Sequence, residues 1–420
     1  MTRLISAPWI LPVVQPPIAD GGVVVDATDT ILAIGRRADL LRLHPEASEE
    51  RADGFLLPAL VNAHCHLELS ALAGAVPGGD GLVAWATKLV ALVRALDPAA
   101  AADAAATAAA AMVAAGTAAV GDVGNSLTAV PAIGAAGLRG IFFHELVGSR
   151  DARAGGALAD AGRELEYFLA GPTESGAATW PTGLAYVPAP HAPYSVGREL
   201  LRKIFHVAAR AGVPTSVHVA EDADEIRLLR DGSGRWPAVL QRMGVDPTTR
   251  VPGQPPVAYL ASLGAFEAAQ PPLLVHMVHA DADDRRRARD AGATAVLCPR
   301  SNLHITGDLP DVGALLADGV HLAIGTDSLA STPELSLWGE LATLAARFPQ
   351  VPPRIWLDAV THAGAEAMQL GPLGSLTPGK RPGIIEVMPH TGPSATSLAA
   401  SPEATLVGDA HPDVRWRARA

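Results

Sequence analysis

Two histidines one residue apart, His64 and His66, end an apolar run that begins at Leu56. In an extended strand, side chains at positions i and i+2 point to the same side, so these two imidazoles can aim at one point. Paired imidazoles are common ligands of metal ions. An arbitrary His-x-His is more often two surface histidines in a loop, but this run is too apolar for a surface loop. We therefore interpret the pair as the end of a buried parallel strand and as half of a metal site.

Polar residues also follow other apolar runs of the chain. They are Glu68, His191, His218, Glu221, His276, Asn302 and Asp327. A solitary histidine at a strand end is usually a satisfied core residue. Burying so many polar groups together at the ends of neighbouring strands would cost free energy unless they shared a partner, and a metal ion is such a partner.

Three imidazoles and one carboxylate suit a divalent transition metal, and we expect zinc, with iron or manganese also compatible. The inferred ligands are His64, His66, His218 and Asp327. Water coordinated by such a metal can have its pKa lowered to about 7. Glu221 lies three residues beyond His218 and is expected to carry the proton of this water to the substrate. His276 is expected to stabilise the developing oxyanion, and Asp327 to act as a second proton acceptor.

The elements that must position these residues follow a repeating pattern. Apolar β-type runs begin near residues 56, 118, 140, 184, 215, 273, 293 and 320, and helical stretches separate them. Eight such runs predict an α/β fold, a (β/α)8 barrel, whose active sites lie at the C-terminal ends of the strands. We expect helices over 81–96 and 98–116, and extra helices over the barrel mouth between 222 and 272.

The two ends of the chain have β-type patterns of their own. Residues 21–35 predict two short strands joined by an Asp/Thr turn, and the chain after 369 has Gly/Pro turns and short strands. We expect the two ends to pair in a small β-sandwich beside the barrel. The predicted domains are therefore 1–55, the N-terminal part of the sandwich; 56–368, the metal-dependent barrel; and 369–420, the C-terminal part and tail.

Composition narrows the class of protein. The 420 residues are 49% hydrophobic, with a formal net charge of -11 and no basic cluster, which favours a small-molecule partner over nucleic acid. Cys65 and Cys298 both fall in strand-like segments, so a reducing cytoplasm is expected rather than a disulfide framework. We find neither a signal-peptide pattern nor an apolar run long enough to span a membrane.

Five motifs in order resemble the amidohydrolase superfamily, in particular its cytosine/guanine deaminase-like branch. They are residues 58–66, 218–221, 276, 299–302 and 325–331. The longer stretches 64–70, 191–195 and 298–302 are similar to the aminodeoxyfutalosine deaminase group, enzymes of a menaquinone route. One departure is Pro382-Gly383, where the family usually has Ala-Asp before its last strand.

The resemblance also implies how many metals the site holds. Binuclear members mostly bridge two metals with a carboxylated lysine at the end of strand four. Lysines occur here only at 88, 203 and 380, none at a predicted strand end, and His191 occupies that rim. We therefore expect one metal per chain. A homodimer is common among similar proteins.

The resemblance implies hydrolytic deamination of an aromatic amidine carbon with release of ammonia. We expect a 6-aminopurine nucleoside that carries an extended, carboxylate-bearing group. Candidates for substrate contact are His191 and Glu68 for the base or ribose, Arg300, Arg150 and Arg235 for the carboxylate, and Trp236 and Tyr194 for stacking, with Asn302 as a further substrate-binding candidate. For Arg150 and Arg235 an ordinary surface charge is the favoured interpretation, and either aromatic ring could simply fill the core.

Two alternatives use the same observations. Another mononuclear amidohydrolase, such as a guanine or cytosine deaminase, a triazine chlorohydrolase or a cyclic amidase, would share the metal residues and differ in the pocket. A catalytically inactive scaffold would need neither Glu221 nor Asp327, and both are present. Nucleic-acid-editing deaminases are excluded because they use a Cys-x-x-Cys zinc site.

Overall fold

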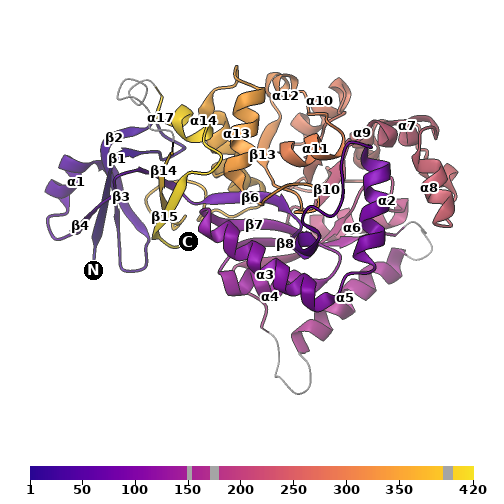
Figure 1. Ribbon diagram of the computed structural model, residues 1–420, viewed down its shortest axis with the longest axis horizontal. Coiled ribbons are helices and arrows are strands. Elements are labelled where there is room, and N and C mark those ends of the chain that lie inside the picture. Colours follow the sequence, from indigo (N-terminus) through magenta and orange to yellow (C-terminus); the bar gives the residue numbers. More distant parts are fainter. Residues whose placement is uncertain (149–153, 171–178, 391–400) are drawn as a thin grey trace. The chain divides into compact units, whose positions relative to one another are not determined.

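The fold is described from a computed structural model, which covers residues 1–148, 154–170, 179–390 and 401–420. Helices alternate with strands, and this confirms the α/β class (Figure 1). The chain divides into two compact units. The first contains Met1–Ala63, Ala110–Val120 and Ser336–Ala420, and the second contains His64–Ala109 and Gly121–Leu335. All the candidate site residues named above lie in the second unit, apart from Arg150, which is outside the described residues.

The first unit contains a seven-stranded sheet with the order β15-β14-β5-β1-β2-β3, in which β4 also pairs with β1. Its strands are β1 (Arg3–Ile10), β2 (Ile18–Val25), β3 (Ile31–Arg36), β4 (Ser48–Arg51), β5 (Phe55–Pro58), β14 (Ile384–Met388) and β15 (Asp413–Ala418). β14 pairs antiparallel with β5, so the C-terminal segment joins the sheet that contains the N-terminal strands. The tail contributes β15, which no sequence signal had indicated.

The apolar run at residue 56 forms two strands rather than one. It splits after Pro58, so that β5 belongs to the seven-stranded sheet and β6 (Leu60–Cys65) to another. Both strands are buried along their whole length, which explains why the run is continuously apolar. The two histidines therefore lie at and just beyond the end of β6.

The remaining strands form two four-stranded sheets, with the orders β6-β7-β8-β9 and β10-β11-β12-β13. They are β7 (Thr117–Gly124), β8 (Arg139–Leu146), β9 (Leu184–Pro190), β10 (Ser216–Val219), β11 (Leu273–His276), β12 (Thr294–Leu297) and β13 (His321–Ile324). The pairs β8–β9, β10–β11, β11–β12 and β12–β13 are parallel. These strands correspond to the predicted β runs.

Backbone hydrogen bonds continue from one four-stranded sheet to the other at both ends. The N–H of His218 donates to the carbonyl of His191 at 2.9 Å, and the N–H of Thr326 donates to the carbonyl of His64 at 2.9 Å. Gly325 permits the second approach, because a Cβ there would lie 2.6 Å from the carbonyl oxygen of His64. The candidate site lies at these junctions.

Helices connect the strands along the chain. They are α1 (Arg37–Leu43), α2 (Leu82–Val93), α3 (Pro98–Ala114), α4 (Val130–Ala136), α5 (Ala154–Ala170), α6 (Arg198–Ala211), α7 (Ala223–Asp231), α8 (Trp236–Arg242), α9 (Pro256–Ser262), α10 (Ala282–Asp290), α11 (Pro299–Ile305), α12 (Val312–Asp318), α13 (Leu337–Arg347), α14 (Pro353–Ala359), α15 (His362–Ala367) and α17 (Pro402–Val407). The predicted helices over 81–96 and 98–116 appear as α2 and α3, and α7, α8 and α9 fill the stretch from 222 to 272. Among the described residues, no helix is both long enough and apolar enough to cross a bilayer.

Candidate metal and active site

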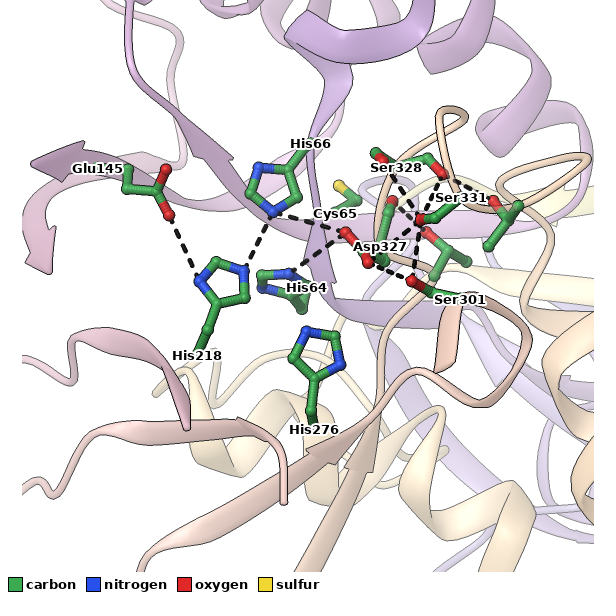
Figure 2. Close-up of polar contacts among 12 residues, drawn as sticks. His64, Cys65, His66, Glu145, His218, His276, Ser301, Asp327, Ser328 and Ser331 are labelled. Atoms are coloured by element: carbon green, nitrogen blue, oxygen red, sulfur yellow. Dashed lines mark hydrogen bonds and ion pairs between the residues drawn. The ribbon is translucent and has the colours of Figure 1, made fainter. Parts of the chain in front are cut away.

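Three histidines from β6, its end and β10 converge on one point. The candidate ligand atoms of His64, His66 and His218 all lie within 4.8 Å of one another, and all three residues are buried. The Nε2 atoms of His66 and His218 are 3.3 Å apart. Figure 2 shows these rings beside the ring of His276 and the carboxylate of Asp327. The alternation of β6 therefore aims both of its histidines into one site.

The tautomer of His218 favours a cation at this point. Its Nδ1 donates to the carbonyl of His191 at 2.9 Å, so its Nε2 carries a lone pair directed toward His66. Burial lowers the pKa of His66 to about 4 and also lowers the pKa of His218. Neutral imidazoles packed this closely can present their lone pairs to one shared cation. The donor set therefore fits a divalent transition metal.

Asp327 presents one carboxylate oxygen to the histidines and the other to two serines. Its Oδ1 lies 3.6 Å from Nε2 of His66 and 3.9 Å from Nε2 of His64. Its Oδ2 accepts hydrogen bonds from the hydroxyls of Ser301 and Ser331. The serines lie behind the carboxylate in Figure 2 and fix its orientation. Oδ1 of Asp327 thus faces two of the three clustered histidines.

Glu221 and His276 face each other beside this cluster. Oε1 of Glu221 lies 3.6 Å from Nε2 of His276, and both residues are buried. Burial raises the pKa of Glu221 well above its usual value, and the charge of Asp327 adds to that shift. This shift favours the acid form of the carboxyl group, which can donate a proton.

Asn302 sets the tautomer of His276. Its amide nitrogen lies 3.0 Å from Nδ1 of His276 and donates to it, which leaves the ring proton on Nε2. Burial lowers the pKa of His276 to about 3, so the ring is neutral. His276 therefore points an N–H donor toward the site, as stabilisation of an oxyanion requires. Asn302 does not line the pocket, and direct substrate contact by it has no support from this placement.

Left-handed backbone conformations gather at these strand ends. Ala220 has a φ of +53°, His276 of +77° and Asp327 of +59°, although none of them is glycine. Such conformations cost free energy and persist only where the surrounding structure imposes them. Each one turns the chain sharply at the point where a functional side chain must face the site.

Glu145, near the end of β8, belongs to the site but was not predicted. Its Oε1 lies 3.4 Å from Nδ1 of His218, and the amide of Asn125 donates to its Oε2 at 3.0 Å. With His191 and His218 it forms a second group of potential metal-ligating atoms. Its signal in the sequence is a charged residue inside an otherwise apolar strand. The neighbouring His144 has no part in the site, because it lies on the other face of β8 and contacts the hydroxyl of Tyr186 at 2.8 Å.

A pocket of about 820 Å³ opens onto the cluster. Glu221, His276 and Asp327 line it together with His191, a predicted substrate residue. Apolar residues of α2 and α8 form much of the remaining wall, which agrees with the helices expected over this face. The predicted stacking residues Tyr194 and Trp236 also line the pocket and stack on each other, with ring centroids 4.3 Å apart.

Three other predicted substrate residues do not line the pocket. Glu68 accepts hydrogen bonds from the backbone N–H groups of Asn125 and Ser126, so its carboxylate holds a loop. Arg300 pairs with Glu334 at 3.2 Å, and Arg235 pairs with Asp224 at 2.6 Å. The placement of these three side chains therefore does not support direct contact with the substrate. Among the described residues, the arginines that line the pocket are Arg94 and Arg242.

The chain belongs to the amidohydrolase family, whose model matches residues 55–412. This confirms the resemblance inferred from the motifs.

Relatives within the family are named as deaminases. The aminodeoxyfutalosine deaminase of Deinococcus radiodurans is 34% identical over 355 residues, which cover 82% of this chain and 80% of the relative. The structure of the Helicobacter pylori aminofutalosine deaminase matches with a TM-score of 0.80 at 22% identity, covering 99% of this chain and 98% of that chain. An adenosine deaminase from Xanthomonas campestris, solved with bound zinc, matches with a TM-score of 0.72 at 23% identity. The match covers 97% of this chain and 92% of that chain. At these identities the two structures show a shared fold.

Proposed function

We propose that this protein is a metal-dependent hydrolytic deaminase that converts the amino group of a 6-aminopurine nucleoside to an oxo group and releases ammonia. The observation that carries the proposal is the arrangement of a proton donor, Glu221, and an N–H donor, His276, 3.6 Å apart beside a buried group of three histidines. Family membership and relatives named as deaminases support it. An aminodeoxyfutalosine-like nucleoside is the substrate that we favour.

The proposal includes the architecture that supports the site. We propose that the two four-stranded sheets close into a (β/α)8 barrel, because hydrogen bonds continue between them at His191–His218 and at His64–Thr326. Residues 56–368 would form this barrel domain. Residues 1–55 and 369–420 would form the flanking sandwich, which β5 joins across this boundary, since Leu56 packs with Ile5 and Ile384 in one core.

The proposed cofactor is one divalent metal per chain, with zinc favoured, as in the zinc-bound relative from Xanthomonas campestris. The side chains that would hold it are His64, His66, His218 and Asp327. When bound, such a metal acts as a Lewis acid and lowers the pKa of water, so that the nucleophile is available at neutral pH. Two further carboxyl groups lie beside this ligand set without belonging to it: Glu145 faces His218, and Glu221 faces His276.

The proton path follows from the protonation states of the residues. Glu221 is held as the acid and would protonate a ring nitrogen next to the amino-bearing carbon, which makes that carbon electrophilic. The Nε2–H of His276 would donate to the oxygen of the tetrahedral centre. Glu221, now a carboxylate, would take up a proton from the attacking water and pass it to the amino group, which leaves as ammonia; Asp327 is the alternative carrier of that proton.

The pocket provides the substrate contacts. His191 lines it, and its Nδ1 is 2.5 Å from the hydroxyl of Ser195, which leaves Nε2 for the base or the ribose. Trp236 offers an aromatic surface in the same wall. At about 820 Å³ the pocket is at the large end of the usual range for small-molecule sites, which favours a substrate larger than a free base.

A substrate panel tests the proposed function directly. Purified protein would be incubated with adenine, adenosine, S-adenosylhomocysteine, guanine, cytosine and aminodeoxyfutalosine, and ammonia release would be measured. We expect turnover of the adenine nucleosides and little or none of cytosine. Turnover restricted to guanine or cytosine would contradict the substrate class. Absence of ammonia release from every compound, in protein that retains its metal, would contradict deamination itself.

A further inference from the structure

Glu225 is a buried carboxyl group that the chemistry described above does not use. It lies in the first turn of α7, four residues beyond Glu221, and is 0% exposed. Its Oε1 accepts a hydrogen bond from the N–H of Ala220 at 3.0 Å, and its Oε2 accepts one from the N–H of Glu221 at 2.9 Å. One side chain therefore holds two consecutive peptide groups with its two oxygens.

The peptide groups that Glu225 holds are at the sharpest turn of this segment. β10 ends at Val219, and Ala220 adopts the left-handed conformation with a φ of +53°. On the opposite side, the carbonyl of Ala220 accepts a hydrogen bond from the N–H of His279 at 2.8 Å. Hydrogen bonds thus fix the turn through both its N–H groups and its carbonyl group. Glu225 accepts the bonds from the N–H groups.

The side chain that depends on this turn is Glu221. Its carboxyl group lines the pocket and lies 3.6 Å from His276. Because the N–H of Glu221 is bonded to Glu225, its backbone cannot rotate away from the pocket unless that bond breaks. A proton donor must be held within hydrogen-bond reach of the atom that it protonates, so the orientation of this peptide controls its efficiency.

We propose that Glu225 is a positioning residue that locks the backbone at Ala220 and Glu221, so that the Glu221 carboxyl group faces the ring nitrogen that it protonates. The proposal rests on the proposed function to the extent that Glu221 is the proton carrier. Glu225 itself does not line the pocket, so it acts through Glu221 and not on the substrate.

The variant Glu225→Gln tests the proposal, because its amide keeps one acceptor and turns an NH2 group toward the other N–H. We expect kcat to fall roughly 10- to 100-fold, as for a displaced catalytic group, with KM and metal content close to wild type. Glu225→Asp keeps the carboxyl group with a shorter reach and should retain an intermediate kcat. It also tests the proposal if the glutamine variant folds poorly.

A matched control comes from Glu386, which holds two consecutive peptide groups elsewhere in the chain. Its Oε1 accepts from the N–H groups of Asp53 at 2.8 Å and Gly54 at 2.9 Å. It is 1% exposed and does not line the pocket. Glu386→Gln should therefore leave kcat unchanged even where it lowers stability. An equal fall of kcat in this control and in Glu225→Gln would contradict a specific role for Glu225.

A double-variant cycle with Glu221→Gln separates positioning from general stability. If Glu225 acts through Glu221, adding Glu225→Gln to Glu221→Gln should lower kcat less than roughly 3-fold further, because the group that it positions is already disabled. Losses that multiply in the double variant would overturn the proposal, as would a wild-type kcat in Glu225→Gln alone.

Amide hydrogen exchange gives a measurement that does not depend on activity. The amides of Ala220 and Glu221 should exchange faster in Glu225→Gln than in wild type, and at the wild-type rate in Glu386→Gln. Unchanged exchange at these amides would overturn the proposal. If the wild-type protein deaminates none of the purines tested, the proposed function fails, while this exchange measurement still decides whether Glu225 holds the turn.

Discussion

At the scale of single residues, Glu221 carries the sharpest prediction. It is buried, burial raises the pKa of its carboxyl group, and it lies outside the proposed set of metal ligands. Glu221→Gln should therefore keep the metal and lower kcat by roughly 10²- to 10⁴-fold, the usual contribution of general acid–base catalysis. Steady-state ammonia release and elemental analysis of the same sample would check both parts. A fully active variant would contradict the proton-carrier role.

Glu145 is predicted to affect the metal rather than the proton. Its carboxyl oxygen lies 3.4 Å from Nδ1 of His218, on the side of the ring opposite the proposed metal. Removing this charge with Glu145→Gln should weaken metal affinity roughly 10- to 100-fold, as other outer-shell substitutions do. Competition with a chromogenic chelator would measure it. His144→Gln is the control on the other face of the same strand, and an affinity loss equal to that of Glu145→Gln would refute the assignment.

At the scale of secondary-structure elements, Asp284 in the first turn of α10 makes stability depend on pH. Burial raises the pKa of this carboxyl group to about 7 from 3.8. The folded protein therefore keeps the proton that the unfolded chain releases between about pH 4 and 7. As pH rises through this window, the wild type loses stability relative to a variant that is always neutral, and the difference is constant above about pH 7.

Asp284→Asn isolates this effect, because its amide oxygen can still accept from the N–H of Ala258. The difference in unfolding free energy, variant minus wild type, should be larger by roughly 2–4 kcal/mol at pH 8 than at pH 4. The variant is therefore the relatively more stable protein at pH 8, since each pKa unit corresponds to about 1.4 kcal/mol. Urea unfolding at both pH values would measure this. Asp290→Asn, at an exposed position of the same helix, should show no such change. A pH-independent difference for Asp284→Asn would refute the prediction.

At the scale of the whole molecule, the proposed metal should stabilise the fold as well as the reaction. Its ligands come from segments far apart in the chain, and the unfolded chain does not hold them together. Metal at 100 times its dissociation constant adds roughly 2.7 kcal/mol to the unfolding free energy. Chelation should therefore lower Tm by several degrees, and added zinc should restore it. An unchanged Tm after complete metal removal would argue against a site that links these segments.

Much of the site could be predicted from sequence because its signals are local. The i, i+2 spacing of His64 and His66 aims both side chains to one side of a strand, whatever the rest of the fold does. Glu221 follows His218 at a spacing that carries it just past the strand end. The apolar runs and the helical stretches between them likewise predict the order of strands and helices. Burial and chain direction determine these features within a few residues.

The tertiary structure decided which side chains reach the pocket. Glu68 follows His64 and His66 closely, yet its carboxylate holds the loop at Asn125. Glu145 and His144 are equally polar neighbours in an apolar strand, and only the orientation of β8 sends one to the site and the other away. Such choices depend on contacts between segments far apart in the sequence, and composition and periodicity carry no information about those contacts. Sequence alone therefore determined the chemistry available at the strand ends, whereas packing decided which groups share the site.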